Sequence, residues 1–260
     1  MDIDVRIPDS SRAAAADFGD GSGVSVMAGG TIMMNLLNSY RAQPSKVLLL
    51  HKAGLSYVNQ DGSTVTIGAT TPLADLAGLP APLGPCAANI GDPAIRGQGT
   101  VGGNLCAIAS EEFPVGDLQG ALLALGATVR STGEGGERTE GLAEFLSSGG
   151  SRLLLEVSFQ LPAAGAFEAL RRPHTKHFTP LAVSGALASD GEVRLAATGA
   201  ASTGVRLSSA EAAANDPSEA GQAALEDVTL ADDALASAWY RGRTLPTLVE
   251  RVLTQLKEQA

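Results

Sequence analysis

Two glycine-rich clusters constrain this 260-residue chain more than any other feature. The first spans Met27 to Thr31 and the second spans Gly99 to Asn104. Glycine loses more conformational entropy on folding than other residues, so such clusters need a tight turn or a close backbone approach to explain them. Neither cluster has the spacing G-x-G-x-x-G or the ending G-K-[ST], so neither predicts a doubly wound dinucleotide fold or a P-loop.

Each cluster combines bare backbone with a threonine hydroxyl. The first follows an apolar strand over residues 24–27 and precedes an apolar run over 32–37. A diphosphate carries many acceptor oxygens, and backbone N–H groups can reach them where side chains are small. The alternatives are a tight strand-to-helix turn for the first cluster and a β-bulge or turn for the second. Two such clusters in one chain are more informative than either alone.

Composition excludes several classes of function. The formal charge is −10 and no Lys/Arg run is present, which argues against nucleic acid or an anionic membrane as the main partner. The two cysteines form no C-x-x-C pair, so we expect neither a disulfide framework nor a metal site. The N-terminus has no secretory pattern and no apolar run reaches about 18 residues, so we expect a cytoplasmic protein without a membrane span.

The pattern of elements changes twice along the chain. The first 50 residues predict a small α/β unit, and the following stretch to about residue 160 predicts an α+β mixture with antiparallel pairing and a hairpin turn at Asp61-Gly62. Residues 94–106 contain too many glycines for a regular helix. Near the end, a hairpin over 181–198 precedes a tail helix over 232–257, with Pro246 expected in its first turn.

The order of motifs resembles the FAD-binding subunit of molybdenum hydroxylases, the group that includes xanthine dehydrogenase and carbon monoxide dehydrogenase. The two glycine clusters carry this resemblance. Supporting motifs are Ile67-Gly68-Ala69 before Thr70-Thr71, Pro93 to Arg96 before Gly99-Thr100, Pro114 to Leu118 before Leu122 to Ala127, and Ser237 to Arg241. The match covers nearly the whole chain in the family's order.

The resemblance implies an α+β fold in two domains. A two-part FAD-binding domain of the PCMH type would occupy residues 1–160, with subdomains of about 1–54 and 55–160. A C-terminal α+β domain, with an antiparallel sheet and helices, would occupy residues 161–260. The cofactor implied is FAD.

The resemblance also assigns cofactor-binding residues and no catalytic or metal-binding ones. The expected FAD contacts are Ala28, Gly29, Gly30, Thr31 and Ile32 on one side of the pyrophosphate, Thr100, Val101, Gly102, Gly103 and Asn104 on the other, and Asp117 at the flavin's sugar portion. Asp117 has a second interpretation as the N-cap of a helix over residues 118–125. The two roles are compatible.

The implied function is electron transfer within a complex. Electrons would arrive from a [2Fe–2S] small subunit, after hydroxylation of substrate on a molybdopterin large subunit, and would leave to an external acceptor. The family suggests a heterotrimer or a dimer of heterotrimers. Two alternatives stay open: a stand-alone flavin oxidoreductase of the same FAD fold, and a flavin-free scaffold subunit of such a complex.

Several positions depart from the family's pattern. Extra residues are present at 110–113, and Glu156 interrupts an apolar run. The stretch 167–172 lacks the lysine that many members place near the flavin ring. Either Arg171 or Arg172 takes its place, or the ring has less positive charge beside it. The His174-x-x-His177 pair has no further ligand nearby and predicts a surface loop rather than a metal site. Cys106 is expected to be a small buried side chain, because no flanking cation would lower its pKa.

Overall fold

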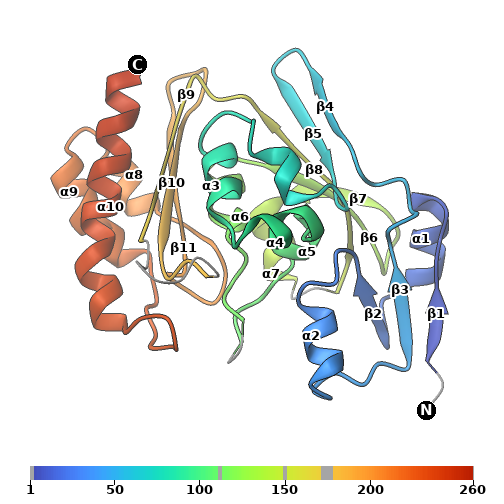
Figure 1. Ribbon diagram of the computed structural model, residues 1–260. Coiled ribbons are helices and arrows are strands. Elements are labelled where there is room, and N and C mark those ends of the chain that lie inside the picture. Colours follow the sequence, from blue (N-terminus) through green and yellow to red (C-terminus); the bar gives the residue numbers. More distant parts are fainter. Residues whose placement is uncertain (1–2, 111–112, 149–150, 171–177, 260) are drawn as a thin grey trace.

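The computed structural model describes residues 3–110, 113–148, 151–170 and 178–259. Three β-sheets follow one another through the molecule, with the N-terminus at one end and the C-terminus at the other (Figure 1). The mixture of helices with mainly antiparallel sheets confirms the α+β class. Among the described residues, no helix is both long and apolar enough to cross a membrane.

The first sheet is parallel and has the strand order β1-β3-β2. Its strands and helices are β1 (Asp4–Arg6), α1 (Ser11–Phe18), β2 (Val24–Met27), α2 (Met33–Asn38) and β3 (Lys46–Leu49). Parallel strands need crossover connections, and here each crossover contains one short helix. The α/β unit predicted for the first 50 residues is confirmed, and the first glycine cluster forms the turn between β2 and α2.

The second sheet is antiparallel, in the order β4-β5-β8-β6-β7. Its strands are β4 (Val58–Asp61), β5 (Thr64–Gly68), β6 (Thr128–Thr132), β7 (Arg138–Gly141) and β8 (Leu153–Gln160). The predicted hairpin is present, but Asp61 pairs with Thr64, so its two-residue turn begins at Gly62 rather than Asp61. Gly62 has φ +58°, which explains why glycine stands there.

A β-bulge in β8 explains the interrupted apolar run. Arg130 of β6 pairs with Glu156, but the next residue pairs with Leu154, so Leu155 is extra. Before the bulge, Leu153 and Leu155 pack into the core beneath the first sheet. Beyond it, Val157 and Phe159 pack into the central core on the opposite face.

Glu156 itself is held by two partners. Its carboxylate accepts hydrogen bonds from Arg130 at 2.9 and 3.1 Å and from the Tyr57 hydroxyl at 2.5 Å. The Arg130 guanidinium, followed by the Tyr57 hydrogen bond, lowers the pKa of Glu156. Burial, followed by the hydrogen bond to Glu156, raises the pKa of Tyr57 to about 12. Glu156 therefore stabilises the second sheet through these hydrogen bonds.

Short helices fill the centre of the molecule. They are η1 (Leu73–Leu76), α3 (Leu83–Asn89), α4 (Pro93–Gln98), α5 (Val101–Leu105), α6 (Leu118–Ala124) and α7 (Leu142–Ser147). The prediction of no regular helix over 94–106 was wrong for two short segments, α4 and α5. Asp92 and Thr100 start them, since each side chain accepts a hydrogen bond from the backbone N–H three residues later.

The third sheet lies between helices from two parts of the chain. Its order is β12-β11-β10-β9, all antiparallel. The elements of this region are β9 (Ala164–Ala169), β10 (Ala182–Leu187), β11 (Val193–Thr198), β12 (Val205–Arg206), α8 (Ser208–Ala212), α9 (Pro217–Ala223), η2 (Ala224–Glu226) and α10 (Ala238–Gln259). Helix α10 contacts β9 and β10, whereas α6 contacts β10 and β11 (Figure 1).

The tail helix begins later than the sequence predicts. It starts at Ala238 rather than Asp232, because the Asp233 carboxylate accepts from the N–H groups of Leu235 and Ala236 and holds that segment as a turn. Pro246 therefore lies inside α10 and not in its first turn. The buried apolar face expected for this helix is present.

Candidate functional site

One large cavity receives contributions from all parts of the chain. It has a volume of about 1200 Å³, above the roughly 300–1,000 Å³ of ordinary small-molecule sites. Its lining includes residues 26–33, residues 99–107 except Val101 and Leu105, and residues 113–117. Phe178 and Leu235 reach it from the C-terminal region. A cavity of this size accommodates an extended ligand such as a dinucleotide.

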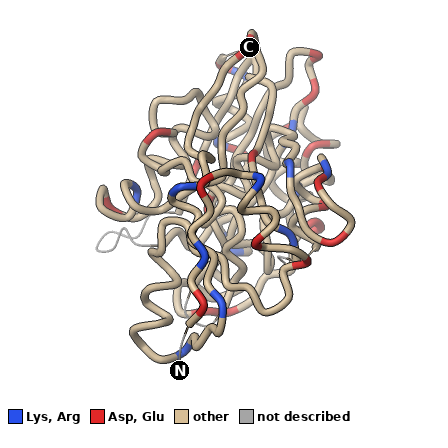
Figure 2. The backbone as a smooth tube through the Cα atoms, turned by 90° about the vertical axis from the view of Figure 1, so that its right-hand side faces the viewer, with Lys and Arg blue, Asp and Glu red and all other residues tan. Residues whose placement is uncertain are grey.

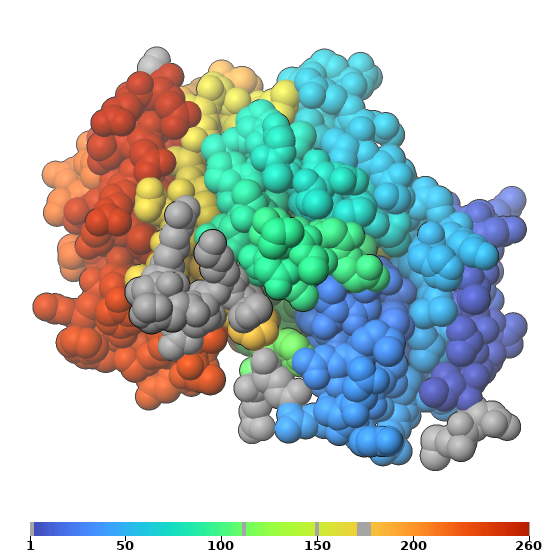
Figure 3. All heavy atoms as spheres, viewed as in Figure 1, coloured from blue at the N-terminus to red at the C-terminus, as the bar shows by residue number. Residues whose placement is uncertain are grey.

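The two glycine clusters lie against each other at this cavity. A β-carbon added to Gly29 would lie 1.9 Å from the backbone oxygen of Gln98 and 3.1 Å from the Cα of Gly99. The side-chain amide of Gln98 also donates a 2.9 Å hydrogen bond to the Gly29 carbonyl. In the space-filling view, the blue segment around α2 meets the green segment around residue 100 (Figure 3). Only glycine permits this approach at position 29.

The first loop, defined as residues 28–32, carries unused backbone donors. Within the described part of the chain, the N–H groups of these residues donate no hydrogen bond. The Gly30 carbonyl, in contrast, accepts from the N–H of Met34 at 2.9 Å. Gly30 has φ +74°, a left-handed conformation that suits glycine and forms turns able to bind anions. The loop thus offers hydrogen-bond donors to a ligand.

The second loop, defined as residues 99–104, has its backbone donors engaged except for the N–H of Thr100, which donates to no group within the described residues. The N–H of Val101 donates to Thr71, and the N–H of Gly102 donates to Ala69. The N–H of Gly103 donates to the Thr100 hydroxyl at 3.1 Å. The first two of these bonds join the loop to the segment that follows β5. What remains facing the cavity is small surface: Thr100, Gly102, Gly103 and Asn104 line it.

Val101 is the one expected contact that the structure places elsewhere. Its side chain is fully buried in the central core, and it is not among the cavity-lining residues. The remaining ten residues expected to contact the cofactor all line the cavity. The structure therefore brings the predicted segments to one cavity, but the sequence did not distinguish inward-packing from cavity-facing side chains.

The side chain of Asn104, rather than that of Asp117, caps helix α6. Asp117 was considered as the N-cap of this helix, but its backbone is helical and its side chain makes no capping bond. The side-chain oxygen of Asn104 accepts instead from the N–H of Leu118 at 2.9 Å. Asp117 is left lining the cavity, and burial raises the pKa of its carboxyl against the lowering effect of hydrogen bonds from Thr179 and Asn104.

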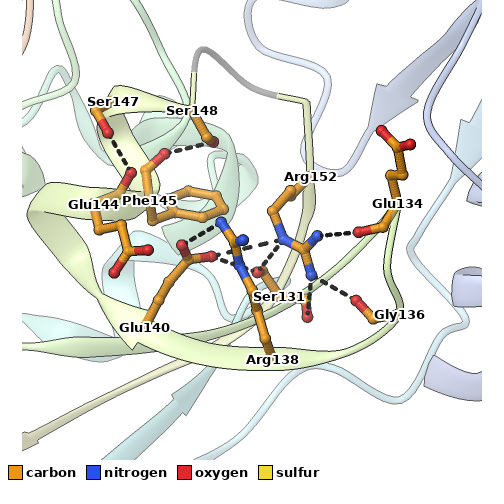
Figure 4. A network of polar contacts seen from close by, with 10 residues as sticks. All are labelled: Ser131, Glu134, Gly136, Arg138, Glu140, Glu144, Phe145, Ser147, Ser148 and Arg152. Atoms are coloured by element: carbon orange, nitrogen blue, oxygen red, sulfur yellow. Dashed lines mark hydrogen bonds and ion pairs between the residues drawn. The ribbon is translucent and has the colours of Figure 1, made fainter.

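Arg152 is the only cationic side chain among the described residues lining the cavity. Its guanidinium is fully occupied by the hairpin beneath it, as Figure 4 shows. It donates to Ser131 Oγ at 2.8 Å and to the carbonyls of Glu134 and Gly136 at 2.8 and 2.6 Å. Glu140 lies 3.7 Å away and completes the network. An anionic ligand here depends on backbone N–H groups more than on a free cation.

The cavity also has a part that the sequence did not indicate. Phe113 and Phe178 line it, with ring centroids 6.4 Å apart in an edge-to-face arrangement. Cys106 lines it too and is exposed, so the expectation of a buried side chain was wrong. Phe113 belongs to the extra segment at 110–113, which was the only signal that could have drawn attention to it; Phe178 carried none.

Metal binding finds no support in the described residues. Within residues 3–110, 113–148, 151–170 and 178–259, no three His, Cys, Asp or Glu side chains are grouped as metal ligands. His174, His177, Arg171 and Arg172 lie outside these residues.

Charged residues of both signs are interspersed on the side of the molecule that carries the first sheet (Figure 2).

These features fit FAD. A diphosphate requires several hydrogen-bond donors beside bare backbone, and the first loop supplies both. The two fused-ring systems of FAD, adenine and isoalloxazine, require apolar walls, which the cavity provides at Val24, Val26 and Leu50 and again at the two phenylalanines. A side chain at Gly103 would enter the cavity, since an added β-carbon meets only the Thr100 hydroxyl at 3.0 Å.

Comparison with known proteins gives the same result. Residues 1–159 match the family described as the FAD binding domain in molybdopterin dehydrogenase. The chain is 31% identical to the 6-hydroxypseudooxynicotine dehydrogenase complex subunit alpha of Paenarthrobacter nicotinovorans, covering 99% of this chain and 95% of that protein. It is 29% identical to the carbon monoxide dehydrogenase medium chain of Hydrogenophaga pseudoflava, covering 65% of this chain and 64% of that one.

Solved structures share the whole fold. A chain of carbon monoxide dehydrogenase from Hydrogenophaga pseudoflava superposes with a TM-score of 0.87 at 26% identity, over 100% of this chain and 99% of that one. Quinoline 2-oxidoreductase from Pseudomonas putida 86 gives 0.83 at 19% identity, over 99% and 98% respectively, which supports the fold alone. The chain belongs to the FAD-binding medium-subunit family of the molybdenum hydroxylases and is an FAD-dependent oxidoreductase subunit.

Proposed function

We propose that this chain is the electron-transferring subunit of a molybdenum hydroxylase complex. It would accept electrons from a [2Fe–2S] small subunit, which receives them from a molybdopterin large subunit, and pass them to an external acceptor. FAD, when bound, supplies storage for two electrons. The single observation that carries the proposal is the pair of glycine loops in contact at the wall of one large cavity.

The chain's own residues bind and orient the cofactor. The first loop, Ala28 to Ile32, would donate N–H groups to the pyrophosphate. The second loop would provide a close-packed wall, with Thr100, Gly102, Gly103 and Asn104 facing the ligand and Val101 anchoring the wall in the core. Asp117 would accept hydrogen bonds from the flavin's sugar portion.

The apolar side chains that line the cavity would exclude water from the bound cofactor. Phe113, Phe178 and Leu235 line the part of the cavity reached from the C-terminal region. Apolar walls lower the local dielectric constant and favour flat ring systems. We place the flavin ring at this end, because the side chain of Thr179, the residue after Phe178, hydrogen-bonds to Asp117.

Domain limits follow the same proposal. The FAD-binding part would comprise residues 1–160, in subdomains of about 1–54 and 55–160, and the C-terminal domain residues 161–260. The strands of the first two sheets fall within 1–160, and β8 ends at Gln160. The third sheet with α8 to α10 falls beyond it. The assembly proposed is a heterotrimer or a dimer of heterotrimers, in the cytoplasm, where reducing conditions maintain the two free cysteines.

The test uses the complex. The three chains are co-expressed, purified together and examined for flavin by visible absorption and for stoichiometry by mass. In anaerobic mixing, the chemically reduced [2Fe–2S] subunit should bleach the flavin band of this chain. A yellow chain that is reduced only by a small organic substrate would indicate a stand-alone oxidoreductase instead. A colourless chain that still assembles would indicate a scaffold.

A further inference from the structure

We propose that Gln98 is a positioning residue that orients the first loop toward the cofactor's diphosphate. This inference rests on the proposed placement of FAD between the two loops. Gln98 is the last residue of α4 and precedes the second loop directly. Its side chain reaches across to the first loop and donates to the Gly29 carbonyl at 2.9 Å.

The hydrogen bond acts on one peptide plane. In a trans peptide, the carbonyl of Gly29 and the N–H of Gly30 point in opposite directions. Because the Gly29 carbonyl points toward Gln98, the Gly30 N–H points away from α4. That N–H donates to no group within the described residues. Gln98 thus sets the direction of the Gly30 N–H without contacting it.

The next peptide plane is fixed in the same way from the opposite direction. The Gly30 carbonyl accepts from the Met34 N–H at 2.9 Å, so the Thr31 N–H points away from α2. Two successive carbonyls are held by the protein, and the two N–H groups behind them are left for a ligand. One carbonyl is held by α2 itself, whereas the other depends on a side chain from a distant segment.

A flexible glycine pair needs such an external restraint. Gly29 and Gly30 have no β-carbons to limit rotation of the peptide between them. A preorganised donor binds an anion more tightly than one that must be ordered on binding. Gln98 supplies this preorganisation while contributing little to the core, since its own side chain is exposed.

The experiment replaces the donor and keeps the shape. Gln98→Met removes the hydrogen bond with little change in length, and its matched control is Gln60→Met. Gln60 is another exposed glutamine whose side-chain amide donates to a glycine carbonyl, that of Gly62, at 3.0 Å in the distant hairpin. FAD is removed from each full-length chain, and its affinity is measured by flavin fluorescence. NMR order parameters of the backbone amides of residues 28–32 and thermal unfolding are measured on the FAD-free chains.

We expect Gln98→Met to weaken FAD binding about tenfold, which corresponds to roughly 1.4 kcal/mol. The order parameters of the first-loop amides should fall, whereas the melting temperature should stay within about two degrees of the wild type. Gln60→Met should bind FAD as the wild type does. Binding by Gln98→Met within about twofold of the wild type, or an equal loss in both variants, would overturn the inference. Failure of the wild type itself to bind FAD would instead overturn the proposed site.

Discussion

The two glycine loops look alike in sequence but differ in how their backbone groups are used. In the first loop, the N–H groups of residues 28–32 have no partner within the described chain. In the second, the N–H groups of Val101, Gly102 and Gly103 all donate to neighbouring protein groups. The first loop leaves all of its backbone donors for a ligand, whereas the second leaves only the N–H of Thr100 without a partner among the described residues. A count of backbone donors therefore separates a ligand-binding turn from a wall that supports it.

The glycines themselves also have different purposes. At Gly29 a β-carbon would meet protein backbone, whereas at Gly103 it would meet almost nothing but the cavity. The first glycine is required for the two loops to close, and the second is required for the ligand to enter. Substitutions at these positions should consequently separate folding from binding.

The largest effect is expected from Gly29→Ala. Its β-carbon would lie 1.9 Å from the backbone oxygen of Gln98, which no side-chain rotation can relieve. We expect a loss of about 3 kcal/mol in unfolding free energy, at the upper end for overpacking, together with loss of FAD. Denaturant unfolding and flavin content measure the two effects. The control is Gly97→Ala in α4, next to Gln98, where an added β-carbon has no atom within 4 Å beyond its chain neighbours and the nearby backbone of its own helix. Equal behaviour of the two variants would refute the close approach.

Gly103→Val should affect binding alone. The chain should fold with near-normal stability, because the added side chain enters the cavity rather than the core. FAD affinity should fall at least about 100-fold, or roughly 2.7 kcal/mol. Gly103→Ala should give an intermediate loss. Titration with FAD and circular dichroism check both parts, and normal flavin content in the valine variant would move the phosphate away from the second loop.

Asp117→Asn should weaken FAD binding about tenfold and stabilise the FAD-free chain. Burial raises the pKa of this carboxyl in the folded state, so its ionised form is disfavoured there. Its effect on stability is therefore most favourable at low pH and is lost as pH rises through the folded pKa. The stability advantage of the asparagine variant should grow from about pH 4 toward neutrality. Melting temperatures across that range test this, and a pH-independent difference would contradict it.

The smallest effect is expected from Thr100→Val, which removes the N-cap of α5. The Gly103 N–H would lose its partner at 3.1 Å, and a cap of this kind contributes about 1 kcal/mol. Thr100→Ser keeps the hydroxyl and should retain most of the stability. Comparing the unfolding free energies of the two variants isolates the cap. A serine variant as unstable as the valine one would show that the threonine methyl, not the hydroxyl, matters.

Much of the fold was predictable from local patterns. The strand over 24–27, the hairpin of β10 and β11, and the apolar face of α10 all follow from periodicity and turn residues. The late start of α10 was not predictable in this way, because it depends on how the Asp233 carboxylate binds the next backbone N–H groups. Capping by Thr100 likewise made a helix from a glycine-rich stretch.

The candidate site was predictable in its segments but not in its details. Gly29 and Gly103 stand in recognisable motifs, and both line the cavity. Nothing in the sequence shows that Val101 packs inward, or that Phe178 approaches Phe113 from 65 residues away, because these depend on tertiary packing. Gln98 was missed for the same reason: its partner, Gly29, lies 69 residues earlier.

The bulge at Leu155 has a consequence for how the molecule opens. Before the bulge, Leu153 and Leu155 of β8 pack into the core under the first sheet and Leu154 packs into the central core, and the reversal at the bulge adds Val157 and Phe159 to the central core. Loss of this strand would disturb both cores, so the first sheet and the central core should unfold as one cooperative unit. Entry and exit of a bulky ligand must then use motions of the peripheral loops, while the framework that spaces the walls stays rigid.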